Sequence, residues 1–272
     1  MNVDWFIILA SSYEQRTYDL GMAIKTAVRI CEIYELFNIH QRPLPLKIFI
    51  TTLGYPASSG SALLKSLVSL GYMEYDLKAR VYFPTTRMNS MVAWVEQKWF
   101  GNGAVLSAMH RLHEVTNETI SLAVQSDLHA QYVHQIATTL PLPYPRIRQT
   151  IRPLAHSGLG WLMLSAWDEE MVRHLARRLN HADRNKHKRV DIDALVEKVK
   201  AIRQAGYVFS KHTVVQGAGM IGMLIPPASK PGERRFALCV QGPVARLEAK
   251  RDVVLSELAS VTRAIGALGG IR

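Results

Sequence analysis

The stretch GYPASSGSALLKSLVSLGYMEYD, residues 54–76, decides the fold of the first part of the chain. It opens with the tight turn Gly-Tyr-Pro at residues 54–56, and Ser58 or Ser59 is a suitable N-cap for a helix running to about Leu70. A glycine then supplies the stop that commonly ends a helix. We therefore predict one well-delimited helix here, with its leucines on the inner face.

The flanking sequence extends this helix into a small domain. Before it, apolar residues recur at helical spacing over 22–38, prolines follow, and a short helix fits 46–53. After it, two β-rich runs surround a polar turn over 72–83, which predicts a hairpin. Helix, helix, turn, helix and hairpin is the order of a winged helix-turn-helix, which presents one helix end to the major groove and its hairpin to the neighbouring backbone.

The exposed side of the third helix and the hairpin turn carry small hydroxyl residues and cations. Small residues near a helix start allow close approach to base edges, and cations neutralise phosphates. The candidate DNA-contacting residues are Ser58, Ser59, Ser61, Ala62, Lys65, Lys78 and Arg80. Two alternatives stay open, namely a small helical subdomain with serine caps and a solvated lysine, and a winged-helix module that contacts only proteins.

The remaining sequence predicts a second, larger domain. We assign 1–21 to an N-terminal extension, 22–86 to the winged helix-turn-helix, 87–102 to a linker helix with an apolar stripe including Val92, Val95 and Trp99, and 103–272 to the second domain. In that domain helices fit 105–115, 157–166, 168–179, 191–205 and 246–268, and strands fit 119–125, 132–136, 207–215, 220–225 and 236–240. Strand pairs separated by helical blocks favour an α+β fold with a mainly antiparallel sheet.

Composition limits the function classes without selecting one. The 272 residues carry a net charge of +11, of which +2 lies in residues 1–98 and +9 in 99–272, so charge alone does not identify the partner. The two cysteines are far apart and lack zinc-like spacing, which argues against a disulfide framework and a structural metal and favours a reducing, cytoplasmic setting. We expect no signal peptide and no membrane span.

Three patterns imitate catalytic or metal sites. The literal GxGxxG at 217–222 runs directly into prolines, so no helix can follow it to hold a dinucleotide pyrophosphate. His156 and Ser157 are adjacent and lack a nucleophile elbow. His110 and His113 have chelating spacing, but such a pair arises easily among ten histidines. We expect no enzyme and no cofactor, and keep a dinucleotide-dependent or hydrolytic enzyme as an alternative.

Several segments in order resemble the isocitrate lyase regulator (IclR) family of bacterial transcription factors. They are GYPASSGSALLKSLVSLGYMEYD in the first domain, then LHEVTNETISLAV (112–124), RPLAHSGLGWLML (152–164), KVKAIRQAGYVFS (198–210), QGAGMIGMLIPP (216–227) and ALCVQGPVAR (237–246). The resemblance implies a GAF-like second domain that binds a small effector, and homodimers or homotetramers on operator DNA. It thus implies a ligand-responsive regulator, repressor or activator, of a catabolic operon.

The same resemblance implies an effector pocket. Its implied lining is Ser157, Gly158, Leu159, Met220, Gly222, Cys239 and Gln241. A helix start offers N–H groups to a carboxylate and the apolar members form a wall, so the expected effector is a small organic acid or an aromatic compound. Two departures from the family pattern stand out: Trp161 replaces a frequent lysine, and Lys211, His212 and Thr213 replace an acidic pair. We expect Gly158→Val to fill the space that the ligand needs.

Overall fold

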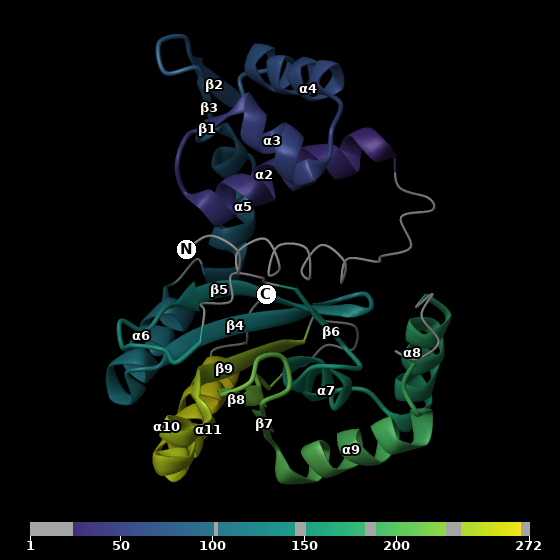
Figure 1. The fold of residues 1–272 in the computed structure, drawn as a ribbon. Coiled ribbons are helices and arrows are strands. Elements are labelled where there is room, and N and C mark those ends of the chain that lie inside the picture. Colours follow the sequence, from purple (N-terminus) through teal and green to yellow (C-terminus); the bar gives the residue numbers. More distant parts are fainter. Residues whose placement is uncertain (1–23, 101–102, 145–150, 183–188, 227–234, 268–272) are drawn as a thin grey trace. The chain divides into compact units, whose positions relative to one another are not determined.

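The structure is a computed structural model of the 272-residue chain, drawn in Figure 1. It describes residues 24–100, 103–144, 151–182, 189–226 and 235–267, with the side chains of 96–100 left out. The described chain divides into two compact units, one within Asp19–Lys98 and the other within Trp99–Arg272.

The first unit packs three helices against a small sheet. Its helices are α2 (Lys25–His40), α3 (Leu46–Leu53) and α4 (Ala57–Ser69), and its strands are β1 (Leu44–Pro45), β2 (Met73–Asp76) and β3 (Val81–Pro84). The strands run antiparallel in the order β1-β3-β2. The core is an apolar cluster that includes Ile33, Leu36, Phe49, Leu64, Met73 and Tyr82. Three helices and a hairpin therefore form where the sequence predicted them.

The limits of α4 correct one prediction and confirm another. The N-cap is Pro56, and neither Ser58 nor Ser59 caps the helix; the Ser59 hydroxyl instead donates to the Pro56 carbonyl at 3.1 Å. A proline is well suited to a helix start because its φ is fixed and its missing N–H has no role there. The end is as predicted, because Gly71 adopts a φ of +75° and its N–H reaches the carbonyl of Val68.

Strand β1 was missed by the sequence prediction. Pro45 was taken only as a helix breaker, yet it pairs with Val81 on the edge of the sheet. Edge strands are where a sheet tolerates proline, because the missing N–H points away from the ladder. The short strand fixes the start of α3 against the hairpin.

Helix α5 (Arg87–Phe100) follows the hairpin. Arg87 anchors its start, donating to the Leu70 carbonyl at 3.0 Å and stacking over the Tyr72 ring at 5.0 Å. The predicted apolar stripe is exposed at Val92, whose exposed fraction is 54%, and the nearby Trp94 is 64% exposed. The side chain of Trp99, also part of that prediction, lies outside the described residues.

The second unit is a six-stranded sheet between two layers of helices. Its strands are β4 (Thr119–Ser126), β5 (His129–Ile136), β6 (Ile151–Pro153), β7 (Val208–Lys211), β8 (Ala218–Leu224) and β9 (Phe236–Pro243), in the antiparallel order β6-β5-β4-β9-β8-β7. Helices α7 (Gly158–Leu164), α8 (Glu169–Ala182) and α9 (Ile192–Ala205) share a core with one face. Helices α6 (Ala104–Thr116), α10 (Val244–Ala249) and α11 (Arg251–Ala267) share a core with the other. The predicted α+β class with an antiparallel sheet is confirmed for this unit.

Three boundaries in this unit differ from the prediction. No element was predicted between 136 and 157, yet this passage contains β6, a short edge strand that ends at a proline. Strand β7 ends at Lys211 instead of 215, because His212 takes a left-handed φ of 55° that no strand continues. The predicted helix 246–268 is two helices, broken at Lys250, whose φ of −121° is not helical.

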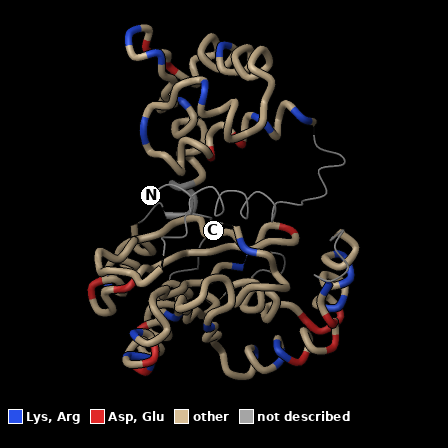
Figure 2. The backbone as a smooth tube through the Cα atoms, in the orientation of Figure 1, with Lys and Arg blue, Asp and Glu red and all other residues tan. Residues whose placement is uncertain are grey.

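Charge is distributed differently in the two units, as Figure 2 shows. In the first unit α3 and α4 each carry one lysine and the hairpin carries both signs of charge, whereas in the second unit α8, α9 and α10 each carry both acidic and basic residues. Among the described residues, no helix combines the length and apolar character needed to cross a membrane.

Candidate functional site

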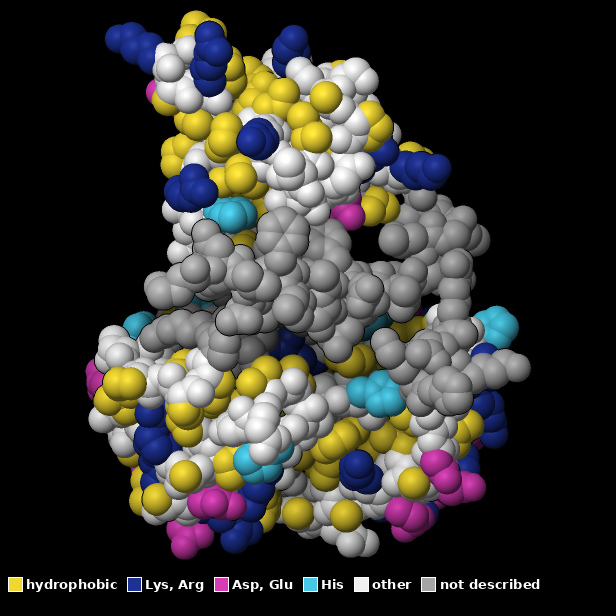
Figure 3. Space-filling view, in the orientation of Figure 1, with side chains coloured by type: hydrophobic (Ala, Val, Ile, Leu, Met, Phe, Trp, Pro, Cys, Tyr) yellow, Lys and Arg dark blue, Asp and Glu magenta, His cyan; other side chains and the backbone are white. Residues whose placement is uncertain are grey.

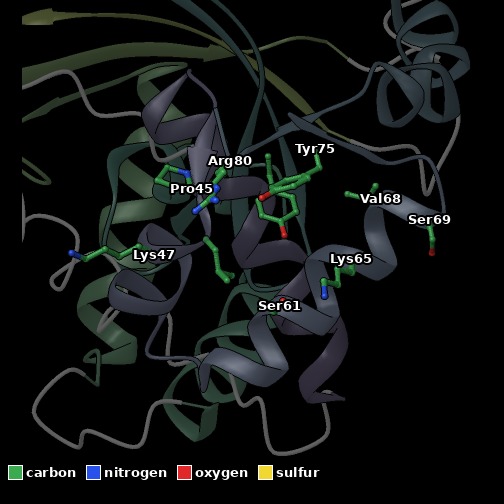
Figure 4. A pocket seen from close by; sticks show the side chains of 10 residues that line it. Pro45, Lys47, Ser61, Lys65, Val68, Ser69, Tyr75 and Arg80 are labelled. Carbon is green, nitrogen blue, oxygen red and sulfur yellow. The ribbon is translucent and has the colours of Figure 1, made fainter. Parts of the chain in front are cut away.

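The first candidate site is a groove of about 560 Å³ in the first unit, between the start of α3, helix α4 and the hairpin. Its lining comprises Pro45, Leu46, Lys47, Ser61, Lys65, Val68, Ser69, Tyr75, Arg80 and Tyr82. Figure 4 shows Ser61 and Lys65 projecting from α4, with Tyr75 and Arg80 across from them on the hairpin. Residues separated by some twenty positions in sequence thus face one another.

Local structure explains how the cations reach this groove. Ser61 and Lys65 are four residues apart on α4 and therefore share one face of the helix. The hairpin turn is tied by Asp76, whose carboxylate accepts the N–H of Lys78 at 2.8 Å and of Ala79 at 3.0 Å. Arg80 has a left-handed φ of 54°, directly precedes β3 and lines the groove.

All charged residues that line the groove are cations. Three cations, Lys47, Lys65 and Arg80, line it, and none of its ten lining residues is acidic. In the space-filling view, Lys and Arg side chains stand apart on the end of the first unit that carries the hairpin, with uncharged side chains between them (Figure 3). Exposed, unpaired cations in an open groove can neutralise the phosphates of a nucleic-acid backbone.

The groove unites part of the predicted DNA-contacting set. It contains Ser61, Lys65 and Arg80; the exposed Ser58, Ala62 and Lys78 and the half-buried Ser59 lie outside its lining. Lys47, Ser69 and Tyr75 were missed by sequence reasoning. Lys47 could have been found, because it opens the helix that precedes α4 in the predicted helix-turn-helix.

The second candidate site is the face of the large sheet that packs against α7. Strand register brings the predicted effector residues together there: Met220 pairs with Gln241, and Gly222 with Cys239. Because paired residues in antiparallel strands share a face, all four lie on the side that holds the α7 core. The sequence resemblance had implied these residues without their register.

This face is unusually polar for the interior of a sheet. Ser121, opposite Cys239, is fully buried and accepts a hydrogen bond of 2.9 Å from the Gln135 amide. Within the part of the chain that the structure describes, Gln241 presents a buried Nε2 without a hydrogen-bond partner. Buried amide donors are normally satisfied, so an unpaired one indicates a position where a ligand oxygen can bind.

The two glycines of the predicted pocket stand in tight packing. A Cβ on Gly158 would lie 2.2 Å from the Cβ of Ser210, and one on Gly222 would lie 3.0 Å from the Cys239 sulfur and from Leu162. The space beside Gly158 is therefore occupied by Ser210, so Gly158→Val would crowd the protein itself in addition to any ligand that binds there.

The N-terminus of helix α7 is capped by a side chain of the protein. The Ser157 hydroxyl caps it, accepting from the Gly160 N–H at 3.0 Å and donating to the Pro153 carbonyl at 2.8 Å. Leu159 is 1% exposed and belongs to the core. Trp161 donates its indole N–H to the Ala155 carbonyl at 2.7 Å and carries Lys198 over its ring, so it has structural partners of its own.

The patterns that imitate active sites have structural roles. In the GxGxxG segment, Gly219 and Gly222 lie in β8, and Gly217 precedes the strand with a left-handed φ of 84°. Burial raises the pKa of the Cys239 thiol to about 12, which keeps it protonated and unreactive. His113 bonds the Glu118 carbonyl at 2.8 Å. No group of three or more potential metal ligands occurs within the described residues.

A protein-family comparison assigns the second unit. Residues 104–267 match the model described as the C-terminal domain of the bacterial transcriptional regulator IclR, which is more than half of the chain. The chain belongs to the IclR family. The predicted family is thus confirmed, and the matched residues run from α6 to α11 and include the whole α7-facing sheet surface.

Solved structures of IclR regulators have the same fold. The regulator from Alicyclobacillus acidocaldarius is 16% identical, with a TM-score of 0.67 over 91% of this chain and 99% of that one. Thermotoga maritima IclR is 13% identical, with a TM-score of 0.63 over 87% and 98%. The effector domain from Acinetobacter sp. ADP1 is 23% identical, with a TM-score of 0.55 over 62% and 98%. No curated protein matches the chain. As an IclR-family member, this chain is a transcription regulator.

Proposed function

We propose that the chain is a ligand-responsive regulator that binds operator DNA through a winged helix-turn-helix at 22–86. In this proposal 87–102 is the linker helix, and 103–272 is a GAF-like domain that binds a small organic acid or an aromatic effector. The regulator controls a catabolic operon as repressor or activator, carries no cofactor and catalyses no reaction.

One observation carries the DNA-binding part: the lining of the groove beside α4 includes three exposed cations and no carboxylate. The element order around it, α3, α4 and hairpin, is that of a winged helix-turn-helix. With Ser61 and Lys65 on the α4 face, base edges and phosphates can be contacted from one helix. Lys47 and Arg80 then contact the backbone on either side.

Assembly on DNA follows from the same geometry. A single helix-turn-helix contacts only a half-site, so a two-fold homodimer, or a homotetramer built from such dimers, is required to bind a pseudo-palindrome. Helix α5 supports this, because Met91, Val92 and Trp94 are all more than half exposed. Clustered apolar side chains on a surface are typical of a subunit interface.

The effector part is supported by the polar interior of the α7 face. Gln241 and the Ser121–Gln135 pair provide directional contacts, while Met220 and Cys239 provide apolar surface. Few polar groups in an apolar setting are typical of small-molecule sites. The hydrolase alternative lacks such support, because the Ser157 hydroxyl already has two backbone partners.

The test is an electrophoretic shift with the DNA upstream of the chain's own gene, across a salt series. We expect sequence-selective retardation whose affinity falls with salt. Lys65→Ala removes one phosphate contact, so it should weaken specific and non-specific binding alike and reduce the log–log salt slope by about one.

The matched control is Arg263→Ala. Arg263 is an exposed cation on α11 whose guanidinium donates to its own helix at the Ala259 carbonyl. Its loss should leave the slope unchanged. Retardation that is absent in the wild type favours the protein-binding alternative, and an unchanged slope in Lys65→Ala places α4 away from the phosphates.

A further inference from the structure

Arg152 is a buried cation in the middle of β6. It is only 6% exposed and pairs across the strands with Ala130 of β5, which is fully buried. Because the two share a face and Ala130 belongs to the α7 core, the Arg152 side chain lies on the α7 side of the sheet.

The described partners of Arg152 are all neutral. Nη1 donates to the Ile151 carbonyl at 2.9 Å, and the guanidinium lies 5.4 Å from the centre of the Tyr132 ring. None of the described ion pairs includes Arg152. The Tyr132 hydroxyl brings no negative charge, because burial raises its pKa well above the usual range.

A comparison within the same unit shows how unusual this is. Glu118, which is also fully buried, is balanced by Arg246 at 2.7 Å and Lys250 at 2.8 Å. Buried charges are normally paired in this way, because taking an ion out of water without a counter-charge is costly. Accordingly, burial lowers the pKa of Arg152, since the surroundings disfavour its charged form.

We propose that Arg152 binds the carboxylate of an organic-acid effector. The inference rests on the proposed function, because it names the ligand class of that effector-binding face. A guanidinium can hold a carboxylate through two parallel N–H bonds, and the neighbouring Tyr132 hydroxyl can donate a third. Strand register pairs Tyr132 with Ala123 and Ala123 with Ala237, which lies two residues from Cys239 on β9. The Arg152–Tyr132 pair therefore borders the sheet surface on which Met220, Cys239 and Gln241 lie.

The position of Arg152 determines how an organic acid would lie on this face of the sheet. Its anionic end meets Arg152 and Tyr132, and its apolar body lies along Ala123, Ala237 and Cys239, which are all fully buried on this face. An aromatic or aliphatic carboxylic acid fits this order of groups. An uncharged aromatic compound would leave Arg152 without a counter-charge.

The first arm of the test needs no knowledge of the effector. In the ligand-free, full-length protein, Arg152→Met replaces an uncompensated buried cation by an apolar side chain of similar length. We expect its Tm to rise by about 2–4 °C. The control Arg246→Met removes a guanidinium that does have a buried carboxylate partner, so its Tm should fall. If Arg152 only stacks on Tyr132, Arg152→Met melts at or below the wild-type temperature, which overturns the proposal.

The second arm compares sodium acetate, benzoate and succinate with sodium chloride at equal ionic strength, and benzoate with uncharged benzamide. We expect at least one carboxylate to raise the Tm of the wild type and not that of Arg152→Met, with no rise from benzamide. Equal shifts in both proteins, or no carboxylate effect in the wild type, contradict the proposal. Operator retardation by the wild type is measured alongside; if it persists, only this inference fails and the proposed DNA-binding function stands.

Discussion

The two units of the molecule place their cations in opposite settings. In the first unit Lys47, Lys65 and Arg80 line an open groove without an acidic neighbour in its lining. In the second unit Arg152 and Arg246 lie in or near the core, and Arg246 pairs with the buried Glu118. Exposed cations attract an extended polyanion over a distance and are screened by salt, whereas a buried cation selects one small anion that replaces its lost hydration.

The two candidate sites also differ in how tightly they are packed. The groove beside α4 is empty space between elements, while the α7 face is filled by its own side chains as far as Ser210 and Met220. A macromolecular ligand can therefore bind the first unit without rearrangement of its core. A small ligand on the α7 face has to displace side chains, and such displacement is a means by which binding can change the preferred state of a regulator.

The largest loss of stability is expected at Glu118, which pairs with Arg246 and Lys250. Glu118→Ala leaves Arg246 and Lys250 without their shared carboxylate, and among its described partners Lys250 then keeps the Thr116 carbonyl. Breaking a buried ion pair from one side costs about 3–5 kcal/mol. We expect urea unfolding to show that loss in the transition of the second unit, identified by hydrogen exchange of β4 and β9.

Glu248→Ala is the matched control. Glu248 pairs with Lys211 at 2.6 Å, but both side chains are more than 40% exposed. Exposed pairs contribute about 0–1 kcal/mol, so this variant should unfold close to the wild type. Equal losses in the two variants would mean that burial does not distinguish the charges of this unit, and the contrast between the two units would then fail.

The next effect concerns the crowded α7 face. Gly158→Val adds a side chain whose Cβ would lie 2.2 Å from Ser210, and overpacking of this kind costs about 1–3 kcal/mol. We expect a lower Tm with and without added carboxylates, and retained operator binding below the transition. Ser210→Gly should restore part of the stability in the double variant. A wild-type Tm in Gly158→Val would show that the face is more open than its packing indicates.

Much of the fold follows from sequence, and the misses share a cause. Helices such as α3 and α9 were predicted because apolar spacing is a local signal, and the structure shows that Asp191 caps α9. Strands β1 and β6 were missed because two or three residues containing a proline become a strand only through a partner distant in sequence.

The residues of the candidate sites also differ in whether local sequence signals could identify them. Ser61, Lys65 and Arg80 could be selected because helix face and hairpin turn are local properties. Lys47 comes from α3, so only its place in the predicted helix-turn-helix order could have selected it. The resemblance implied Met220, Gly222, Cys239 and Gln241, but not Arg152. No sequence pattern separates a buried arginine from the other cations of this basic chain, because its burial depends on the register between β5 and β6.

The smallest expected effect is on the stability of the first unit and comes from a substitution in its core. Gly60 is buried in α4 with no left-handed φ, and an added Cβ would lie 3.7 Å from Tyr55 and 3.8 Å from Ile50, which is ordinary contact. Alanine is favoured over glycine inside a helix by roughly 0.8–1 kcal/mol, so Gly60→Ala should raise the Tm of the first unit slightly. Because Gly60 faces α3 while Ser61 and Lys65 face the groove, the salt slope of operator binding should not change. A stabilised variant with an unaltered slope would show that the core of the first unit and its cationic surface are independent; a changed slope would instead mean that the packing of α4 on α3 sets the position of the groove cations.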